Sequence, residues 1–173
     1  MKIDKEIVSK VERDYVFLTG HVSLNIKYLI NKIEKGIQNS NNNFRTNIVG
    51  YMTDFKFFNE ELLKTNFIYK LFDKLDSYKF LDSYRLDESW GIKEDYGCYT
   101  TQHTHKQSNI SGVIYLNNHS QKLFFPEINQ EVKPKKGEFV IFSSFLKHYT
   151  MRNLENKSKY AIVFNLKYRN FDD

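Results

Sequence analysis

The sequence of 173 residues contains a single cysteine and no long apolar run. Cys98 has no second cysteine with which to form an internal disulfide, which fits a reducing compartment. No stretch of about 18 apolar residues is present to span a membrane, and the segment that begins at Met1 lacks the apolar region of a signal peptide. We therefore expect a cytoplasmic protein with no membrane contact and no disulfide framework.

A basic stripe is also missing. Lysine and arginine number 26 against 21 aspartates and glutamates, which gives a net charge of +5. The lysines are spread along the chain, however, and are not interleaved with aromatic residues as they are on nucleic-acid-binding surfaces. The densest group, residues 133–136, contains Pro134 and precedes Gly137, a pattern typical of a turn. Nucleic acid is therefore not an expected partner.

Aromatic residues, in contrast, are abundant. Fifteen Phe and twelve Tyr, in a chain that is 40% hydrophobic, provide ample apolar area for a core. A chain of this length is most simply one domain, residues 1–173, and is large enough to fold without staples.

The N-terminal half predicts helices together with a few strands. The apolar run at residues 15–18, closed by Gly20, predicts a strand, and residues 46–54 predict another. A helix is expected from Ser23, with Gly36 as its C-terminal cap. Its apolar residues recur at helical spacing: Ile26, Leu29, Ile30 and Ile33.

A second helix is expected from Glu60, with Asn59 as its N-terminal cap. Its stripe of core-facing residues is Leu63, Phe67, Leu71 and Leu75. Extended chain resumes at residues 84–90.

The C-terminal half has a different pattern, in which short β-like runs alternate with turns. The runs are residues 98–104, 112–116, 122–125, 139–142, 148–151 and 160–166. Many short strands at near-regular spacing are typical of a barrel or jelly roll. The expected fold class is therefore α+β, with helical support and first strands in residues 1–88 and a barrel-like core in residues 89–168.

Histidines mark a candidate metal site in this second half. His103 and His105 are two residues apart, so in an extended segment both imidazoles point to one face. Two converging neutral imidazoles need a third ligand, and His148 is the candidate. His21 and His119 lie at predicted turns and are interpreted as ordinary surface or hydrogen-bonded residues.

Lys159 stands one hairpin beyond His148 and opens a β-like run. Along that run, Ala161, Val163 and Asn165 share the face of Lys159, whereas the residues between them share the other face. A lysine at the head of an apolar row is not obviously solvated. Inside a barrel it could pair with the far carboxylate of a metal-bound dicarboxylate.

Taken together, these residues resemble iron(II)- and 2-oxoglutarate-dependent dioxygenases of the prolyl-hydroxylase-like superfamily. The similarity is greatest to the small oxygenases of marine bacteria and phages, so a phage-encoded copy would work in the host cytoplasm. It covers roughly residues 88–168. The matching pieces are Trp90, Gly97-Cys98-Tyr99, His103-Thr104-His105, the segment 111–116, the segment 134–142, His148 and the segment 159–165.

This resemblance implies a double-stranded β-helix, a jelly-roll or cupin-like barrel that holds Fe(II) and takes 2-oxoglutarate as co-substrate. The implied metal ligands are His103, His105 and His148. The implied co-substrate residues are Lys159, Tyr115 and Tyr99. The implied reaction consumes dioxygen and 2-oxoglutarate, hydroxylates a substrate that the sequence does not identify, and releases succinate and carbon dioxide.

Two positions depart from the family pattern. The wider superfamily has Asp or Glu where this chain has His105, and many relatives have Ser or Thr where it has Ala161. Either His105 is a ligand, which strand geometry favours, or it lies behind the ligands and a carboxylate replaces it. The candidate carboxylates are Glu94, Asp95 and Glu127.

Two other functions fit parts of the sequence. A cupin-like metalloprotein that does not use 2-oxoglutarate fits the spacing from Gly97 to His103 and His105, and three-histidine iron is known there. The expected glutamate of that motif is missing, since Asn109 and Ile110 stand in its place. The remaining alternative is a metal-free binding module on the same barrel.

Overall fold

The computed structural model describes residues 13–40, 47–78 and 83–169. Its centre is a six-stranded antiparallel sheet, whose strands lie in this order across it: β1 (Phe17–His21), β9 (Glu138–Ser143), β6 (Ile110–Tyr115), β11 (Lys159–Tyr168), β4 (Tyr84–Glu94) and β3 (Tyr51–Met52). One smaller sheet comprises β10 (Tyr149–Thr150), β7 (Leu123–Phe125) and β8 (Gln130–Val132), and another comprises β2 (Ile48–Val49) and β5 (Tyr99–Thr100). A 3-10 turn, η1 (Pro126–Ile128), joins β7 to β8.

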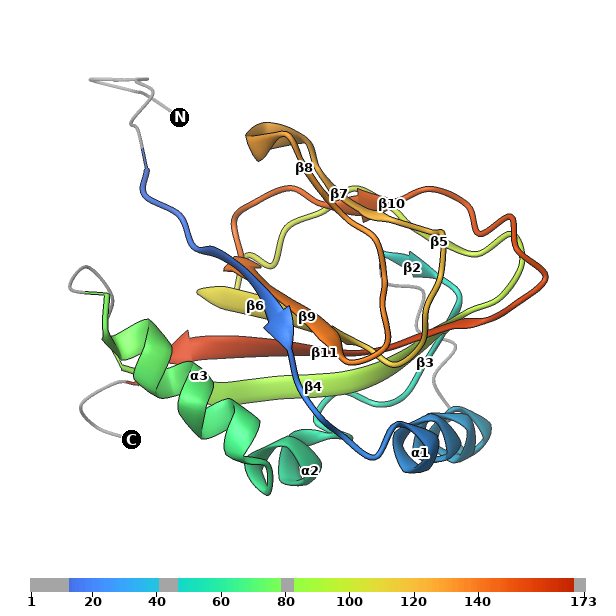
Figure 1. The fold of residues 1–173 in the computed structure, drawn as a ribbon, viewed down its shortest axis with the longest axis horizontal. Helices are drawn as coiled ribbons and strands as arrows, with labels where there is room; N and C mark the ends of the chain where they lie inside the picture. The colour runs from blue at the N-terminus through green and yellow to red at the C-terminus, as the bar shows by residue number, and fades with distance from the viewer. Residues whose placement is uncertain (1–12, 41–46, 79–82, 170–173) are drawn as a thin grey trace, which may run out of the picture.

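Helices and small sheets lie on opposite sides of the six-stranded sheet. The helices α1 (Ile26–Asn39), α2 (Asn59–Leu63) and α3 (Asn66–Asp76) lie together below it in Figure 1, and the two small sheets lie above it. The expected combination of mostly antiparallel sheet with supporting helices is therefore confirmed. No helix of the described residues has both the length and the apolar character that crossing a membrane requires.

The six-stranded sheet is buried on both faces, because alternate residues of its strands enter two different cores. Along β11, Ile162 and Phe164 pack against the helices, whereas Ala161 and Val163 belong to the core shared with the small sheets. The faces predicted for this run are thus correct. Gly112 of β6 lets the Phe164 ring lie flat on the sheet, since a Cβ there would be 2.2 Å from the ring.

Helix α1 continues past the glycine that was expected to cap it. Gly36 lies inside the helix, and Ser40 is the C-terminal cap. A Cβ at position 36 would lie 2.7 Å from the Phe57 ring and 2.8 Å from the Thr53 methyl group. Gly36 therefore serves the close approach of α1 to residues 53–57, and the prediction of a cap was wrong.

The single helix predicted from residue 60 is two helices. Thr65 is extended, with φ −93° and ψ 140°, and its hydroxyl donates to the Leu62 carbonyl oxygen at 2.6 Å, so α2 ends there. Because of this break, the residues that face the core differ from the predicted stripe: Leu63 is 41% exposed, whereas Ile68 is fully buried. Asn59 is the first helical residue rather than the cap, and its side-chain amide donates to the Asp87 carbonyl oxygen of β4 at 3.1 Å.

Most predicted runs of the second half are strands, with shifted ends. The exceptions lie where the small sheets form: residues 98–104 and 148–151 each contain only a two-residue strand. Residues 46–54 likewise hold the two short strands β2 and β3, and the first strand begins at Phe17 rather than at residue 15. Strand β8 was missed because Gln130 and Glu131 are polar and exposed, so its sequence has no apolar run.

Candidate metal centre

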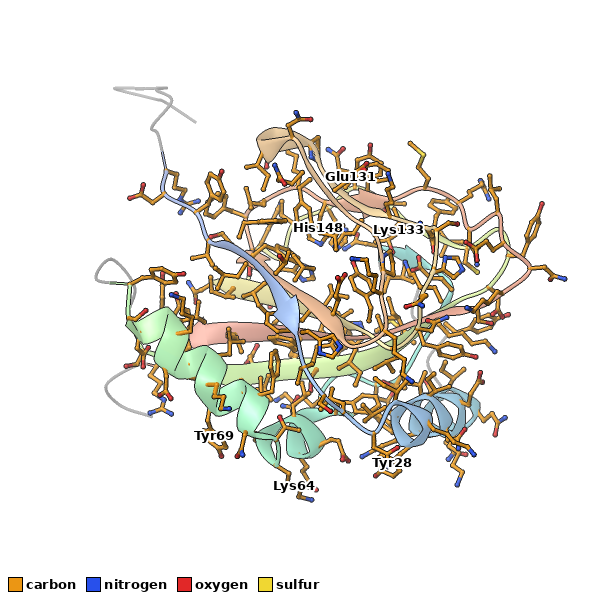
Figure 2. The ribbon with its side chains drawn as sticks, in the orientation of Figure 1. Tyr28, Lys64, Tyr69, Glu131, Lys133 and His148 are labelled. Carbon is orange, nitrogen blue, oxygen red and sulfur yellow. The ribbon has the colours of Figure 1, made fainter. Side chains whose placement is uncertain are left out.

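Three imidazoles meet in the core between the six-stranded sheet and the small sheets. The nitrogen ligand atoms of His103, His105 and His148 all lie within 4.8 Å of one another. The Nε2 atoms of His105 and His148 are 3.3 Å apart, and their rings are stacked with centroids 5.1 Å apart. Figure 2 shows His148 in the space between the two layers, whereas Tyr69 on α3 points outward.

Backbone pairing, rather than a continuous strand, brings these residues together. The amides and carbonyls of His103 and His148 form an isolated antiparallel bridge, with both N–O distances 3.1 Å. The amide of His105 donates to the Ser144 carbonyl oxygen at 2.9 Å. The segment 103–105 is therefore not the strand that the sequence predicted. It is a loop held at both histidines, which preserves the convergence of their side chains.

Hydrogen bonds fix which nitrogens can bind a metal. Nδ1 of His103 lies 2.8 Å from the Thr101 carbonyl oxygen, and Nδ1 of His148 lies 2.9 Å from the Leu146 carbonyl oxygen. A carbonyl oxygen only accepts, so both Nδ1 atoms carry the proton and both Nε2 atoms keep a lone pair, which on His148 faces the His105 Nε2 atom at 3.3 Å. Such second partners orient metal-binding histidines and make them better ligands.

The three imidazoles are also held in the neutral form that metal binding requires. Burial, with a contribution from His103, lowers the pKa of His105 to about 3. Burial and the two neighbouring histidines lower the pKa of His148 to about 3, and burial lowers the pKa of His103. No imidazole therefore needs to lose a proton near neutral pH before it binds a cation.

The donor set fits iron(II). Imidazole nitrogen is a good ligand for iron. Two nitrogens that share one ion at bond lengths of about 2.1 Å lie roughly 3.0–3.4 Å apart, and the His105 and His148 Nε2 atoms meet this condition. The three histidines are the group of potential ligands that this part of the described chain brings together.

The carboxylates considered as replacements for His105 have other partners. Glu94 forms an ion pair with Lys159. Asp95 accepts a hydrogen bond from the Ser158 hydroxyl, and Glu127 accepts one from the Lys147 amide at 2.9 Å. Glu94 is the one of these three that lines the same cavity as the histidines.

This cavity lies against the histidines and measures about 50 Å³, room for a few water molecules. Its walls are mainly apolar, and they include Trp90, Tyr115 and Lys159. Within the described residues, no hydrogen-bond partner reaches the buried Trp90 Nε1 atom or the buried Tyr115 hydroxyl. Burial raises the pKa of Tyr115, so this hydroxyl keeps its proton and can donate to a bound anion.

Lys159 enters this cavity, as its position in the sequence suggested. Its residue is 2% exposed, and in the antiparallel register of β11 with β4 it stands directly opposite Glu94. The feature that sequence reasoning missed is this ion pair, since Glu94 was considered only as a metal ligand. The available signal was weak: Trp90, Ile92 and Glu94 alternate on one face of β4.

Tyr99 is not brought to the cavity, whereas its neighbour Thr100 is. Successive residues of a strand point to opposite faces, and in β5 the inward position belongs to Thr100. The Tyr99 ring instead faces outward toward the guanidinium of Arg152, whose Cζ atom is 4.7 Å from the ring centroid. Arg152 also donates to the Gly97 carbonyl oxygen at 3.2 Å, so the Tyr99 surface serves to pack this loop.

Of the two histidines set aside, His119 is a buried hydrogen-bonded residue. Its Nδ1 accepts from the Gln121 amide at 3.0 Å, and its Nε2 lies 3.0 Å from the Lys157 carbonyl oxygen. The interpretation of His119 as an ordinary hydrogen-bonded histidine therefore holds, although the sequence did not identify its two partners. His21 is exposed on β1.

The fold is similar to that of solved prolyl hydroxylases and other 2-oxoglutarate–iron(II) oxygenases. One similar structure is a viral collagen prolyl hydroxylase of Paramecium bursaria Chlorella virus-1 in complex with 2-oxoglutarate. It is 16% identical, with a TM-score of 0.65 over 90% of this chain and 96% of that chain. A prolyl-4-hydroxylase of Pseudomonas putida is 14% identical, with a TM-score of 0.66 over 89% and 93% of the two chains.

A third similar structure is HygX of Streptomyces hygroscopicus with nickel and 2-oxoglutarate bound. It is 11% identical, with a TM-score of 0.62 over 90% of this chain and 84% of that chain. No family model and no curated protein sequence matches the chain. The resemblance seen in the sequence is therefore confirmed at the level of the fold.

Proposed function

We propose that this protein is an iron(II)- and 2-oxoglutarate-dependent dioxygenase that hydroxylates a substrate and releases succinate and carbon dioxide. One observation carries the proposal. Three neutral imidazoles converge beside a buried lysine, in a chain whose fold matches a prolyl hydroxylase solved with 2-oxoglutarate over nine-tenths of its length.

In this proposal His103, His105 and His148 hold the iron, and the carbonyl groups behind His103 and His148 keep their Nε2 lone pairs directed at it. When bound, iron(II) and 2-oxoglutarate together supply the oxidising chemistry by which dioxygen hydroxylates a C–H bond. The protein supplies position and dryness. The apolar walls formed by Val113 and Val163 exclude water from the reacting groups.

Lys159 and Tyr115 bind the distal carboxylate of 2-oxoglutarate in this proposal. Lys159 provides the cation, and the buried Tyr115 hydroxyl provides a donor that has no other partner among the described residues. The two positions are close because Tyr115 of β6 pairs with Ala161 of β11, two residues beyond Lys159 on the same face. Tyr99 is left out of the proposed site, since it does not line the cavity.

The wider setting follows the same family pattern. We infer that the sheets form the two layers of a double-stranded β-helix, that residues 1–173 are one domain and that residues 89–168 form its metal-binding core. The single cysteine, Cys98, favours a cytoplasmic location.

The cupin-like alternative shares the three histidines but gives no role to Lys159. Structural similarity to oxygenases with bound 2-oxoglutarate therefore favours the first function. The metal-free module leaves unexplained why three imidazoles bring their ligand nitrogens within 4.8 Å of one another.

The decisive experiment is an anaerobic titration of 2-oxoglutarate into the iron(II)-loaded protein, followed by the metal-to-ligand charge-transfer absorbance. We expect saturable binding at one site per chain and slow release of succinate once oxygen is admitted. Retained iron without any 2-oxoglutarate binding would move the assignment to the cupin-like metalloprotein. A chain that binds no metal would support the metal-free module.

A further inference from the structure

In this cavity a co-substrate would meet a lysine, Lys159, that is already paired with the carboxylate of Glu94. Both side chains are almost completely buried, with exposures of 3% and 0%. Glu94 is held from its other side as well, since its Oε1 accepts hydrogen bonds from Thr100 at 3.1 Å and from Thr150 at 3.4 Å. The carboxylate is therefore a built part of the cavity, fastened to the cation that the proposed function assigns to 2-oxoglutarate.

The ion pair lies in the wall of the cavity that a bound co-substrate would enter. A volume of about 50 Å³ holds a few water molecules. Most of the walls are apolar side chains packed in the core, including Val113 and Leu123. Besides the histidines, Glu94 and Lys159 are the charged residues of this lining, so the second carboxylate of a dicarboxylate would lie against them.

Resting on the proposed function, we propose that Glu94 is an internal competitor for Lys159. In the free protein the Glu94 carboxylate takes the place on the lysine that the distal carboxylate of 2-oxoglutarate takes on binding. Binding must displace Glu94, or else bring two carboxylates against one ammonium group between mainly apolar walls. Glu94 thereby weakens the affinity for dicarboxylate 2-oxoacids, and it reduces their advantage over monocarboxylate 2-oxoacids of the same length.

Tyr115 also supports this proposal, because its hydroxyl differs from Lys159 in having no partner among the residues that the structure describes. Its hydroxyl is buried and lacks a hydrogen-bond partner within the described residues, whereas the neighbouring lysine is already paired. A buried hydrogen-bond donor without a partner is rare in a native protein, and it marks a place for a ligand group. Tyr115 therefore offers a donor to a bound carboxylate, while Glu94 already occupies the lysine beside it.

The test compares two ligands that differ only at the distal end: 2-oxoglutarate, which carries the carboxylate, and 2-oxopentanoate, which ends in a methyl group. Isothermal titration calorimetry on the anaerobic iron(II)-loaded protein measures both dissociation constants. Glu94→Gln retains the shape and the capacity to accept from Thr100 but removes the negative charge. We expect it to bind 2-oxoglutarate at least tenfold more tightly than the wild type, with 2-oxopentanoate within twofold.

Asp95→Asn provides a matched control, because Asp95 is the next residue but lies outside the cavity and pairs with Ser158 and Lys93. It should leave both dissociation constants unchanged. Equal affinity of Glu94→Gln and wild type for 2-oxoglutarate would overturn the proposal. Weaker binding by Glu94→Gln would also overturn it, since Glu94 would then be positioning Lys159 for the ligand.

The wild-type protein offers a measurement that does not depend on whether the variant folds. If Glu94 competes, the distal carboxylate adds less than tenfold to affinity, so 2-oxoglutarate and 2-oxopentanoate bind within tenfold of each other. A free buried lysine would make that preference roughly a hundredfold or more, and such a preference would contradict the competition. Failure of both 2-oxoacids to bind the iron-loaded wild type would overturn the proposed function itself.

Discussion

Replacing Lys159 with methionine is expected to lower the free energy of unfolding much more than replacing Lys93 of the adjacent strand β4 with methionine. Methionine fills nearly the same space but leaves the Glu94 carboxylate buried without a cation. Its remaining hydrogen bonds, from Thr100 and Thr150, do not neutralise the charge. Removing one partner of a buried ion pair typically costs about 3–5 kcal/mol of folding free energy.

A double-mutant cycle that combines Lys159→Met with Glu94→Gln shows where that cost arises. Glu94→Gln alone leaves Lys159 buried without its counter-ion and should also destabilise, by a similar amount. The double variant Lys159→Met/Glu94→Gln leaves no buried charge behind, so its loss should be well below the sum of the two single losses. We expect a coupling energy of at least about 2 kcal/mol in favour of the double variant, as for other directly paired residues.

Urea unfolding followed by far-ultraviolet circular dichroism measures all three variants in the metal-free protein. Lys93→Met is the matched control, because Lys93 precedes Glu94 on β4 and pairs with Glu34 at 3.0 Å, but both side chains are partly exposed. Its loss should be about 1 kcal/mol or less. Additive effects of Lys159→Met and Glu94→Gln, or a Lys159→Met loss no larger than that of Lys93→Met, would refute the reasoning.

Three further predictions follow. His148→Ala should abolish stoichiometric Fe(II) binding, measured by metal analysis after gel filtration, while His21→Ala retains it; full occupancy in His148→Ala would remove that residue from the site. Because the pKa values of His105 and His148 fall to about 3 on folding, the unfolded chain takes up protons first as the pH drops below about 6.5, and metal-free stability should fall by up to about 1.4 kcal/mol per pH unit per histidine. Urea midpoints between pH 7 and pH 4.5 test this, and His148→Ala should have the shallower slope. Gly112→Ala should lose about 1–3 kcal/mol, since its Cβ would lie 2.2 Å from the Phe164 ring; an unchanged midpoint would contradict this packing.

The convergence of the three histidines could be predicted because its signal is local and chemical. Few residue types bind iron, and two residues of one such type, His103 and His105, are two positions apart in the sequence. Their predicted strand was nevertheless absent. The bridge between His103 and His148 provides the convergence that a strand would have provided, so the meeting of the three histidines was predicted through a local structure that does not form.

The Glu94–Lys159 pair could not be predicted in the same way, because it depends on register. The two residues are brought opposite each other by ten paired positions of β4 and β11, with an irregularity between Asn165 and Leu166. A shift of one residue would turn either side chain to the opposite face. Nothing local specifies that register. The break between α2 and α3 is similar, since Thr65 ends the first helix through a single hydroxyl contact in an otherwise helical pattern.

The charges of the proposed site are explained by considering Glu94 and His105 together. A metal centre with one carboxylate ligand carries one negative charge beside the ion, and a free lysine would add a positive charge at the far end of the cavity. In this chain the proposed ligand at that position is the neutral His105, while a carboxylate, Glu94, lies in the same cavity against Lys159. The first arrangement sums to +2 over iron(II), one carboxylate ligand and the lysine, and the proposed arrangement sums to +2 over iron(II), Lys159 and Glu94, so each balances the two negative charges of 2-oxoglutarate. What differs is the position of the negative charge: here it has moved from the metal to the distal end, so the metal end attracts the keto acid more strongly and the distal end attracts the second carboxylate less.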